Sequence, residues 1–500
     1  MRTIIRGSWV IGFKGNTHTL IRNGVLVYEG NRIVHVGGGY DGPFDAEINA
    51  TGKLVGPGFI DVHVHAGDRA GHRLISDGGR PEYFGTPILD VGVKRASDAA
   101  ASTQQSPPST EAAAARTELQ AAFTAVELLR NGITTFVEFG AHREMQEAIL
   151  RQVERLGLRA YLGAGFYCGE WEADGDGRLV RDLADETGER TFQIALDFIT
   201  QINGACEGRV KGILVPRSVE ACTPNLLRRA REKADELGLP IATHAAYSVL
   251  EFHDVMRRYH MTPIEMLASV GMLRPTLNIG HGNFIADNPN LNFSGGRDLA
   301  LLGEAGVTVS HCALNIVRRA RTLDTWERYR IAGVNLALGT DTYPRDMIMN
   351  MRAASYLGKI TSRNLQSAPA GQVFEAATLG GSCALGRNDI GRLAPGALAD
   401  IIIVDIDRRD VLRYAPTFDP IKSLIECGIG DDVSTVIVDG VVRMQESVIK
   451  SVDIGTLRDQ VQREAEANWA NWSDTDTFGR TAEELSPSSF PTESFSSTKG

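Results

Sequence analysis

Two histidines separated by one residue, His63 and His65, are the residues of this sequence best suited to chemistry. They end the segment 56–65, G-P-G-F-I-D-V-H-V-H, in which an apolar strand follows a tight turn. Side chains two apart on a strand share a face, so both imidazoles should project together from the strand's carboxyl end. Such a pair suits zinc, iron, cobalt or manganese. An isolated H-x-H is more often two histidines that merely alternate along a strand, so the assignment depends on the rest of the chain.

Four later segments that have the composition of strands also end in a histidine or an aspartate. These residues are His244, His281, His311 and Asp341. In a barrel of parallel strands the carboxyl ends form the active face, so all four should converge with the first pair on one mouth. A structural role is the usual one for a single strand-end histidine. It is disfavoured here because the residues recur at the ends of successive strands.

Strands and helices that alternate about every 30 residues position these side chains. The pattern predicts an α/β protein, in which residues 57–388 form a (β/α)8 TIM barrel with a lid-like insertion at about 66–110. Residues 1–56 and 389–449 are rich in short β segments that could not bury a face alone. They are therefore expected to form a small β-sandwich domain from both ends of the chain. Residues 450–500 should hold a helix, at 457–472, and a Ser/Thr/Pro-rich tail that cannot build its own core.

The composition excludes several classes of partner. The 500 residues are 43% hydrophobic and 23% charged, as in a soluble globular protein, and the net charge of −10 argues against nucleic acid or an anionic membrane. Charged residues interrupt the first 20 residues, so neither a signal peptide nor a spanning helix is expected there, and the interpretation is a cytoplasmic protein. The six cysteines are scattered without a C-x-x-C pair, which disfavours a cysteine-ligated metal. We expect a small-molecule substrate and a homo-oligomer, a dimer or higher.

Taken together, the motifs resemble those of the amidohydrolase superfamily. The resemblance lies in the segments 57–65, 280–282, 309–312 and 338–341, the isolated His244, and the return to the β-domain at 389–401, and it covers about residues 3–445. It points to the branch of triazine hydrolases and nucleobase or cytosine deaminases. A weaker resemblance is to the phenylurea and thiocarbamate (molinate) hydrolases, although the phenylurea group has asparagine where His63 stands.

The resemblance implies a set of metal ligands and catalytic groups. His63, His65, His244 and Asp341 would bind one divalent transition metal, zinc before iron, cobalt or manganese, together with a water. Such an ion lowers the pKa of a bound water toward neutrality, so Asp341 would be ligand and base at once. His281 would hydrogen-bond that water or the substrate carbonyl oxygen, and His311 would either orient Asp341 or contact the substrate.

A second metal would require a bridging carboxylated lysine or a glutamate. Lys211 lies near the start of strand four, which should be the wrong end of the barrel. Glu138 closes strand two and is the better candidate, but the favoured interpretation is a buried, hydrogen-bonded carboxylate. One metal is therefore expected.

One position departs from the family pattern. The branch usually carries a proton-shuttling glutamate three residues after the strand-five histidine, whereas this chain has Tyr247. A tyrosine, with a reference pKa of about 10, is a poor shuttle at neutral pH, but it can donate a hydrogen bond. Tyr247 is therefore a candidate catalytic residue that would donate to the substrate oxygen or the developing oxyanion, or would only wall the pocket. The preferred function is therefore hydrolysis of a urea, carbamate, thiocarbamate or amide, with Arg345 as a further helper. The alternatives are an aminohydrolase or dechlorinase of an N-heterocycle, such as a triazine, pyrimidine or purine, and an inactive scaffold of the same fold.

Overall fold

The computed structural model describes residues 1–67, 77–78, 94–95, 110–174, 176, 178–407, 412–476 and 478–491. Most of the predicted lid-like insertion at 66–110 lies outside these residues, as do residues 477 and 492–500 of the predicted tail. Among the described residues, no helix combines the length and the apolar character needed to cross a bilayer.

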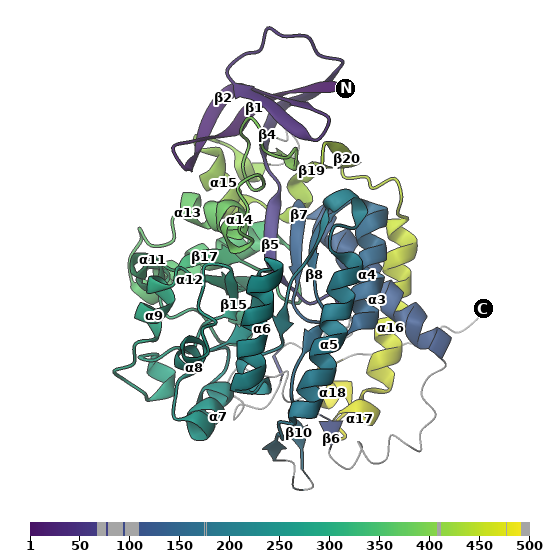
Figure 1. The fold of residues 1–500 in the computed structure, drawn as a ribbon. Coiled ribbons are helices and arrows are strands. Elements are labelled where there is room, and N and C mark those ends of the chain that lie inside the picture. Colours follow the sequence, from purple (N-terminus) through teal and green to yellow (C-terminus); the bar gives the residue numbers. More distant parts are fainter. Residues whose placement is uncertain are drawn as a thin grey trace, which may run out of the picture.

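Both ends of the chain contribute to one seven-stranded sheet, in the upper part of Figure 1. Its order is β20-β19-β18-β4-β1-β2-β3. The strands are β1 (Arg2–Lys14), β2 (Thr17–Glu29), β3 (Arg32–Gly37), β4 (Ala46–Pro57), β18 (Ile401–Asp405), β19 (Val433–Val438) and β20 (Val441–Met444). The two ends meet where β4 pairs antiparallel with β18, with Leu54 opposite Val404. The division of these strands into the two layers of a sandwich stays a prediction.

Eight buried strands form two parallel four-stranded sheets, β12-β8-β7-β5 and β14-β15-β16-β17. They are β5 (Phe59–Val64), β7 (Ile133–Glu138), β8 (Arg159–Leu162), β12 (Val210–Gly212), β14 (Ile241–Ala245), β15 (Leu277–His281), β16 (Thr308–His311) and β17 (Asn335–Leu338). Every residue of β5 and of β7 is buried, as expected of parallel strands that are covered on both faces. Isolated bridges link the two sheets on both sides, Leu214 with Ile241 and Val64 with Asp341.

Helices alternate with these strands and lie outside them (Figure 1). They are α3 (Thr110–Arg130), α4 (Arg143–Leu156), α5 (Asp185–Ile202), α6 (Pro224–Leu237), α7 (Val249–Tyr259), α8 (Pro263–Ser269), α9 (Asp298–Glu304), α10 (Ala313–Val317), α11 (Trp326–Ala332), α12 (Met347–Ser362), α13 (Ala370–Glu375), α14 (Gly381–Ala384) and α15 (Pro420–Cys427). The architecture is therefore α/β, as predicted from the alternating pattern.

The predicted C-terminal helix forms and packs on the body of the protein. Helix α16 (Ile454–Ala470) lies along α3, and Arg116 Nε is 2.6 Å from Glu464 Oε1. The short helices α17 (Trp472–Thr475) and α18 (Ala482–Leu485) follow, and Leu485 is buried. The described part of this segment is thus ordered by contact with the rest of the chain rather than by a core of its own.

Candidate metal centre

Three imidazoles from two distant strands meet at one point. The Nε2 atoms of His63 and His65 are 3.2 Å apart, and the Nε2 atoms of His65 and His244 are also 3.2 Å apart. Asp341, which follows β17, places Oδ1 3.5 Å from His65 Nε2 and 3.9 Å from His63 Nε2. The four residues that the sequence assigned as ligands are therefore brought together.

The donor set fits a divalent metal. His244 Nδ1 donates to the Arg217 carbonyl at 2.5 Å, which leaves the lone pair of Nε2 facing the other imidazoles. A tetrahedral ion with metal–nitrogen bonds of about 2.0–2.1 Å requires nitrogens about 3.3 Å apart, close to the observed separations. A bound divalent ion would be held by His63, His65, His244 and Asp341, and would supply a Lewis acid that lowers the pKa of a bound water.

The Asp341 carboxylate is oriented by Asn315, a residue that sequence reasoning missed. Asn315 Nδ2 donates to Asp341 Oδ2, and the amide oxygen of the same side chain accepts from Thr342 Oγ1 at 2.9 Å. The backbone of Asp341 has φ = 62° and is fixed by its own N–H, which donates to the His63 carbonyl at 2.7 Å. A positive φ at a non-glycine residue is costly and persists where surrounding contacts impose it.

His311 was predicted to orient Asp341 or to contact the substrate. It is buried at the end of β16, with its ring 6.3 Å from that of Trp326, and burial lowers its pKa to about 4. The hydrogen bond recorded at Asp341 Oδ2 comes from Asn315 instead. A substrate-contacting role for His311 stays a prediction.

His281 approaches the second carboxylate oxygen of Asp341, and His65 approaches the first. Its Nε2 is 3.8 Å from Asp341 Oδ2, and its ring centroid is 4.8 Å from that of His63. Burial, followed by the neighbouring His244, lowers the pKa of His281 well below its usual value. A neutral imidazole beside the metal ligands can exchange hydrogen bonds with a water or a substrate oxygen, which is the role that the sequence assigned to it.

His63 is held by close packing on several sides. Its ring stacks on Phe139 at 3.7 Å with an interplanar angle of 10°. A Cβ added at Gly339 would lie 2.4 Å from His63 Cβ, and one added at Gly280 would lie 2.7 Å from its Cε1. These glycines occur in the G-H and L-G-T-D motifs, so at both positions the absence of a side chain makes room for His63.

Asp61, inside the first motif, links β5 to the segment that follows β17. Its carboxylate accepts from Thr340 N at 3.0 Å, from Thr340 Oγ1 at 2.5 Å and from His63 N at 3.2 Å. Burial raises the pKa of Asp61 to about 7 against the effect of these hydrogen bonds. The first motif contains Asp61 and so pointed to a buried carboxylate, but the sequence did not identify Thr340 as its hydrogen-bond partner.

Glu138, the better candidate for a second metal, has its carboxylate occupied by backbone hydrogen bonds. Glu138 accepts from the N–H groups of Ala66, Gly140 and Ala141 at 3.3, 3.0 and 2.9 Å, so its carboxylate fixes the backbone after two strands. Burial raises its pKa to about 7. Within the described ranges, the side chains grouped closely enough to hold a metal are His63 with His65 and His244, and His63 with Cys312 and Asp341. Neither group includes Glu138. A role for Lys211 at a second metal is not tested by this geometry.

Cys312 lies close to two of the expected ligands, since its Sγ is grouped with His63 and Asp341. The residue is buried immediately after β16, and Sγ lies 3.8 Å from the Ser310 carbonyl. The expectation that no cysteine ligates the metal stays a prediction.

Arg345 has a structural task instead of the predicted help in catalysis. Its side chain is buried, Nη2 donates to the His65 carbonyl at 2.8 Å, and Nη1 is 3.1 Å from Glu127 Oε2. The guanidinium therefore fixes the backbone at His65, and its charge is already paired.

Tyr247 lines the site, and its hydroxyl points to a carboxylate. Its ring centroid is 5.8 Å from that of His244 and 6.4 Å from that of His281. The hydroxyl donates to Glu220 Oε1 at 2.7 Å. Glu220 was missed, although an acidic residue soon after strand four, in the segment V-P-R-S-V-E-A, was a signal that could have identified it.

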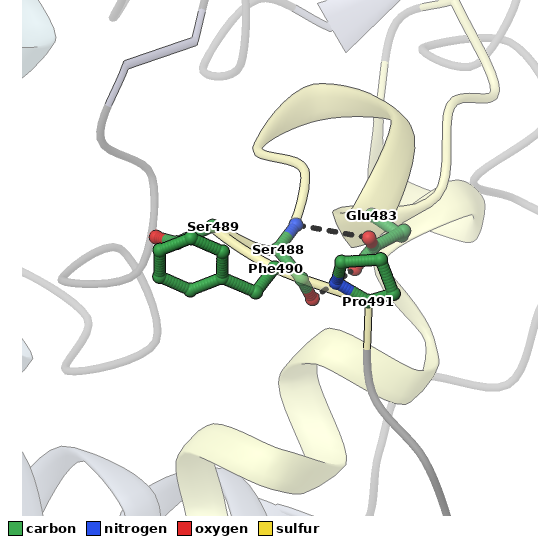
Figure 2. Close-up of a pocket in the computed structure, with 5 residues that line it drawn as sticks. All are labelled: Glu483, Ser488, Ser489, Phe490 and Pro491. Carbon is green, nitrogen blue, oxygen red and sulfur yellow. Dashed lines mark hydrogen bonds between the residues drawn. The ribbon is translucent and has the colours of Figure 1, made fainter.

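An open surface hollow lies elsewhere, on the C-terminal segment. Figure 2 shows the residues that line it, Glu483, Ser488, Ser489, Phe490 and Pro491. The only ionisable group among them is Glu483, whose carboxylate already accepts from the Ser488 N–H and hydroxyl at 2.9 and 3.1 Å. This hollow therefore has no counterpart of the histidine cluster.

Known proteins similar to this chain include several deaminases. A 5-methylthioadenosine/S-adenosylhomocysteine deaminase from Thermococcus sibiricus is 29% identical over 452 residues, 89% of this chain and 94% of the relative. A 5'-deoxyadenosine deaminase from Methanosarcina mazei is 27% identical over 450 residues, again 89% of this chain and 94% of the relative.

Solved structures share the fold. An adenosine deaminase from Xanthomonas campestris with bound zinc superposes with a TM-score of 0.74 at 20% identity, covering 93% of this chain and 98% of that one. Atrazine chlorohydrolase TrzN from Arthrobacter aurescens TC1, complexed with zinc, gives a TM-score of 0.73 at 21% identity and covers 93% and 100%. The family model described as the amidohydrolase family matches residues 54–443. The chain therefore belongs to the amidohydrolase family, as a metal-dependent hydrolase acting on C–N bonds.

Proposed function

We propose that this protein is an aminohydrolase that removes the amino group from an N-heterocycle, with the purine ring of an adenine nucleoside as the substrate class and zinc as the metal. The observation that carries the proposal is the similarity over 89% of the chain to relatives named as deaminases of adenosine derivatives. The cluster of His63, His65, His244 and Asp341 supports it, because hydrolytic deamination needs an activated water beside a base.

The residues around the cluster have separable roles in this reaction. Asp341, held by Asn315, accepts one proton that the attacking water brings and passes it to the leaving amine. His281 hydrogen-bonds the attacking water or the oxygen that it becomes, since its Nε2 lies 3.8 Å from Asp341 Oδ2. Phe139 stacks on one face of His63, whereas the Tyr247 ring lies beside His244 and His281, so we expect the substrate to lie against Tyr247.

A second candidate is hydrolysis of a linear urea, carbamate, thiocarbamate or amide. Tyr247 favours it, because the usual shuttling glutamate is absent from that position. The names of the relatives favour ring deamination, and we therefore place it first.

We also propose that the eight parallel strands close into one (β/α)8 barrel. The two isolated bridges support closure, because each joins an edge of one sheet to an edge of the other. The carboxyl ends of all eight strands would then surround the metal centre, which is the usual place of the active site in this fold.

An ammonia-release screen combined with metal analysis tests the function. The zinc-loaded full chain is assayed on methylthioadenosine, 5'-deoxyadenosine and adenosine, and in parallel on a phenylurea, a carbamate and an anilide, with His244→Ala as the inactive control. We expect ammonia from at least one aminated purine. Cleavage of a urea, carbamate or amide without ammonia from any aminated ring would refute the first candidate and support the second.

A further inference from the structure

We propose that Glu220, acting through the Tyr247 hydroxyl, carries a proton from the attacking water to the ring nitrogen of the substrate. The inference rests on the proposed ring deamination and names the residues that would complete it. It starts from a hydrogen bond between two side chains that are 27 residues apart, Tyr247 Oη to Glu220 Oε1 at 2.7 Å.

The chemistry requires two proton destinations. The attacking water brings two protons, and hydrolysis of an aminated ring must place one on the ring nitrogen and one on the leaving amine. Asp341 can serve the leaving amine, but a metal ligand on one side of the substrate is poorly placed to serve both atoms. The second route needs another ionisable group that faces the site.

The segment that carries Glu220 is tied to a metal ligand. It forms a single 3-10 turn, Val219–Ala221, two residues after β13 (Val215–Pro216). Arg217 and Ser218 lie between β13 and this turn, and the Arg217 carbonyl accepts a hydrogen bond from His244 Nδ1. Ser218 forms an isolated bridge with His244. The position of Glu220 is therefore fixed relative to His244, although Glu220 lies in a turn after β13 and His244 lies on β14.

Glu220 has a free oxygen where no solvent reaches it. The residue is 2% exposed, and Oε2 is buried without a hydrogen-bond partner, whereas Oε1 accepts from Tyr247. Arg181 Nη1 lies 3.3 Å from Oε1 and offsets the cost of burying the negative charge. A buried polar atom left without a partner is costly and calls for a functional explanation.

The neighbouring Glu251 does not meet these conditions. Its two carboxylate oxygens accept from the N–H groups of Ala246 and Tyr247 at 2.8 and 2.7 Å, in the capping box that begins α7. Burial, followed by the negative charge of Glu220, raises the pKa of Glu251 well above its usual value. Glu251 therefore holds the backbone of Tyr247 in place, and Glu220 is the carboxylate bonded to the hydroxyl.

The relay balances over one turnover. The attacking water gives one proton to the Tyr247 oxygen while the Tyr247 hydroxyl passes its own proton to Glu220, and the resulting hydroxide adds to the ring carbon. The electron pair of the C=N bond moves to the ring nitrogen, which takes the proton back from Glu220 through Tyr247. The bond to the amino group then breaks with its electron pair on nitrogen, and Asp341 transfers the proton of the added hydroxyl to it. Ammonia and a ring carbonyl result, and Glu220 and Tyr247 return to their starting states.

The test compares Glu220→Gln, Tyr247→Phe and the double variant with Asp254→Asn, using the zinc-loaded full chain and methylthioadenosine. Asp254 is the matched control because it is the other carboxylate on Arg181, with Oδ2 2.5 Å from Nη2. We expect each relay variant to lose about 10²–10⁴-fold in kcat with KM within about threefold. The double variant should lose little more than either single one, because the two residues act as one unit. Zinc content and Tm should match those of Asp254→Asn.

A relocation variant separates catalysis from packing. Glu220→Gln combined with Tyr247→Glu places the carboxylate at position 247, and it should regain part of the kcat lost in Glu220→Gln. Retention of wild-type kcat in Glu220→Gln, or an equal loss in Asp254→Asn, would overturn the inference alone. If Glu220→Gln does not fold, unchanged kcat in Tyr247→Phe overturns it. A wild-type chain that releases no ammonia from any aminated purine overturns the proposed function together with this inference.

Discussion

A substitution at Asn315 tests whether its hydrogen bond orients the Asp341 carboxylate for metal binding. Asn315 contacts Asp341 but is not one of the four expected ligands. The proposed change is Asn315→Leu, which removes the amide that donates to Asp341 Oδ2 and keeps a similar volume in a site that is 2% exposed. A hydrogen bond to a charged group contributes about 1.5–3 kcal/mol, which corresponds to about 10- to 150-fold in an equilibrium constant. Loss of a group that supports a metal ligand typically costs about 10–100-fold in affinity or activity. The two ranges agree.

The assay is competition for zinc against a chromophoric chelator, followed by kcat/KM for ammonia release and Tm. Thr342→Val is the control, since it removes the 2.9 Å bond to Asn315 Oδ1 but leaves the bond from Asn315 to Asp341 intact. Its zinc affinity should stay close to that of the wild type. An Asn315→Leu protein that is folded and binds zinc within threefold of the wild type would refute the orienting role.

Three further predictions concern the ligands, their packing and the acid stability of the fold. His65→Ala and His244→Ala should each lose the metal and nearly all activity, because each removes one of the clustered nitrogens; full metal content by elemental analysis in either variant would contradict the site. Gly339→Ala should lower Tm and metal affinity, because its Cβ would lie 2.4 Å from His63 Cβ, and an unchanged Tm would count against that packing. Burial, followed by the charge of Arg392, lowers the pKa of His18 to about 4 in the folded protein. Below about pH 6.5 the unfolded chain therefore binds a proton at His18 that the folded chain does not bind. Stability should therefore fall by about 1–2 kcal/mol between pH 7 and 5 on account of this residue. In His18→Gln, urea unfolding should show that much less pH dependence, and an equal dependence would exclude the effect.

The relatives are named as deaminases, yet position 247 carries a tyrosine in place of the usual shuttling glutamate. The proposed relay explains how this chain could still deaminate a ring. A glutamate absent from the loop after strand five is matched by a glutamate in the loop after strand four, and the two positions are joined by the hydrogen bond between Tyr247 and Glu220. A change of position preserves the carboxylate while altering its distance from the substrate. Substrate preference within the aminated rings should therefore differ from that of relatives with the usual glutamate.

The sequence by itself determined the local features on which the site depends. The alternation of strands and helices predicted the α/β class, and the strand-end pattern singled out the histidines and Asp341 as candidates, because the carboxyl ends of parallel strands meet at one face. The choice of His63, His65, His244 and Asp341 as the ligands came from the resemblance to the amidohydrolase superfamily. The pairing of the two chain ends followed from the same local logic, since short hairpins cannot bury a face alone.

Only the tertiary structure decided which side chains support those ligands. Asn315 on Asp341, Thr340 on Asp61, and Glu220 on Tyr247 each join loops or strand ends that are separate in the sequence. Arg345 changed from a catalytic candidate to a support for the His65 backbone for the same reason. Such contacts depend on which strands are neighbours and on how each loop is oriented, and no periodicity in the sequence encodes either. The hydrogen bonds join segments whose separation is set by the packing of the two parallel sheets.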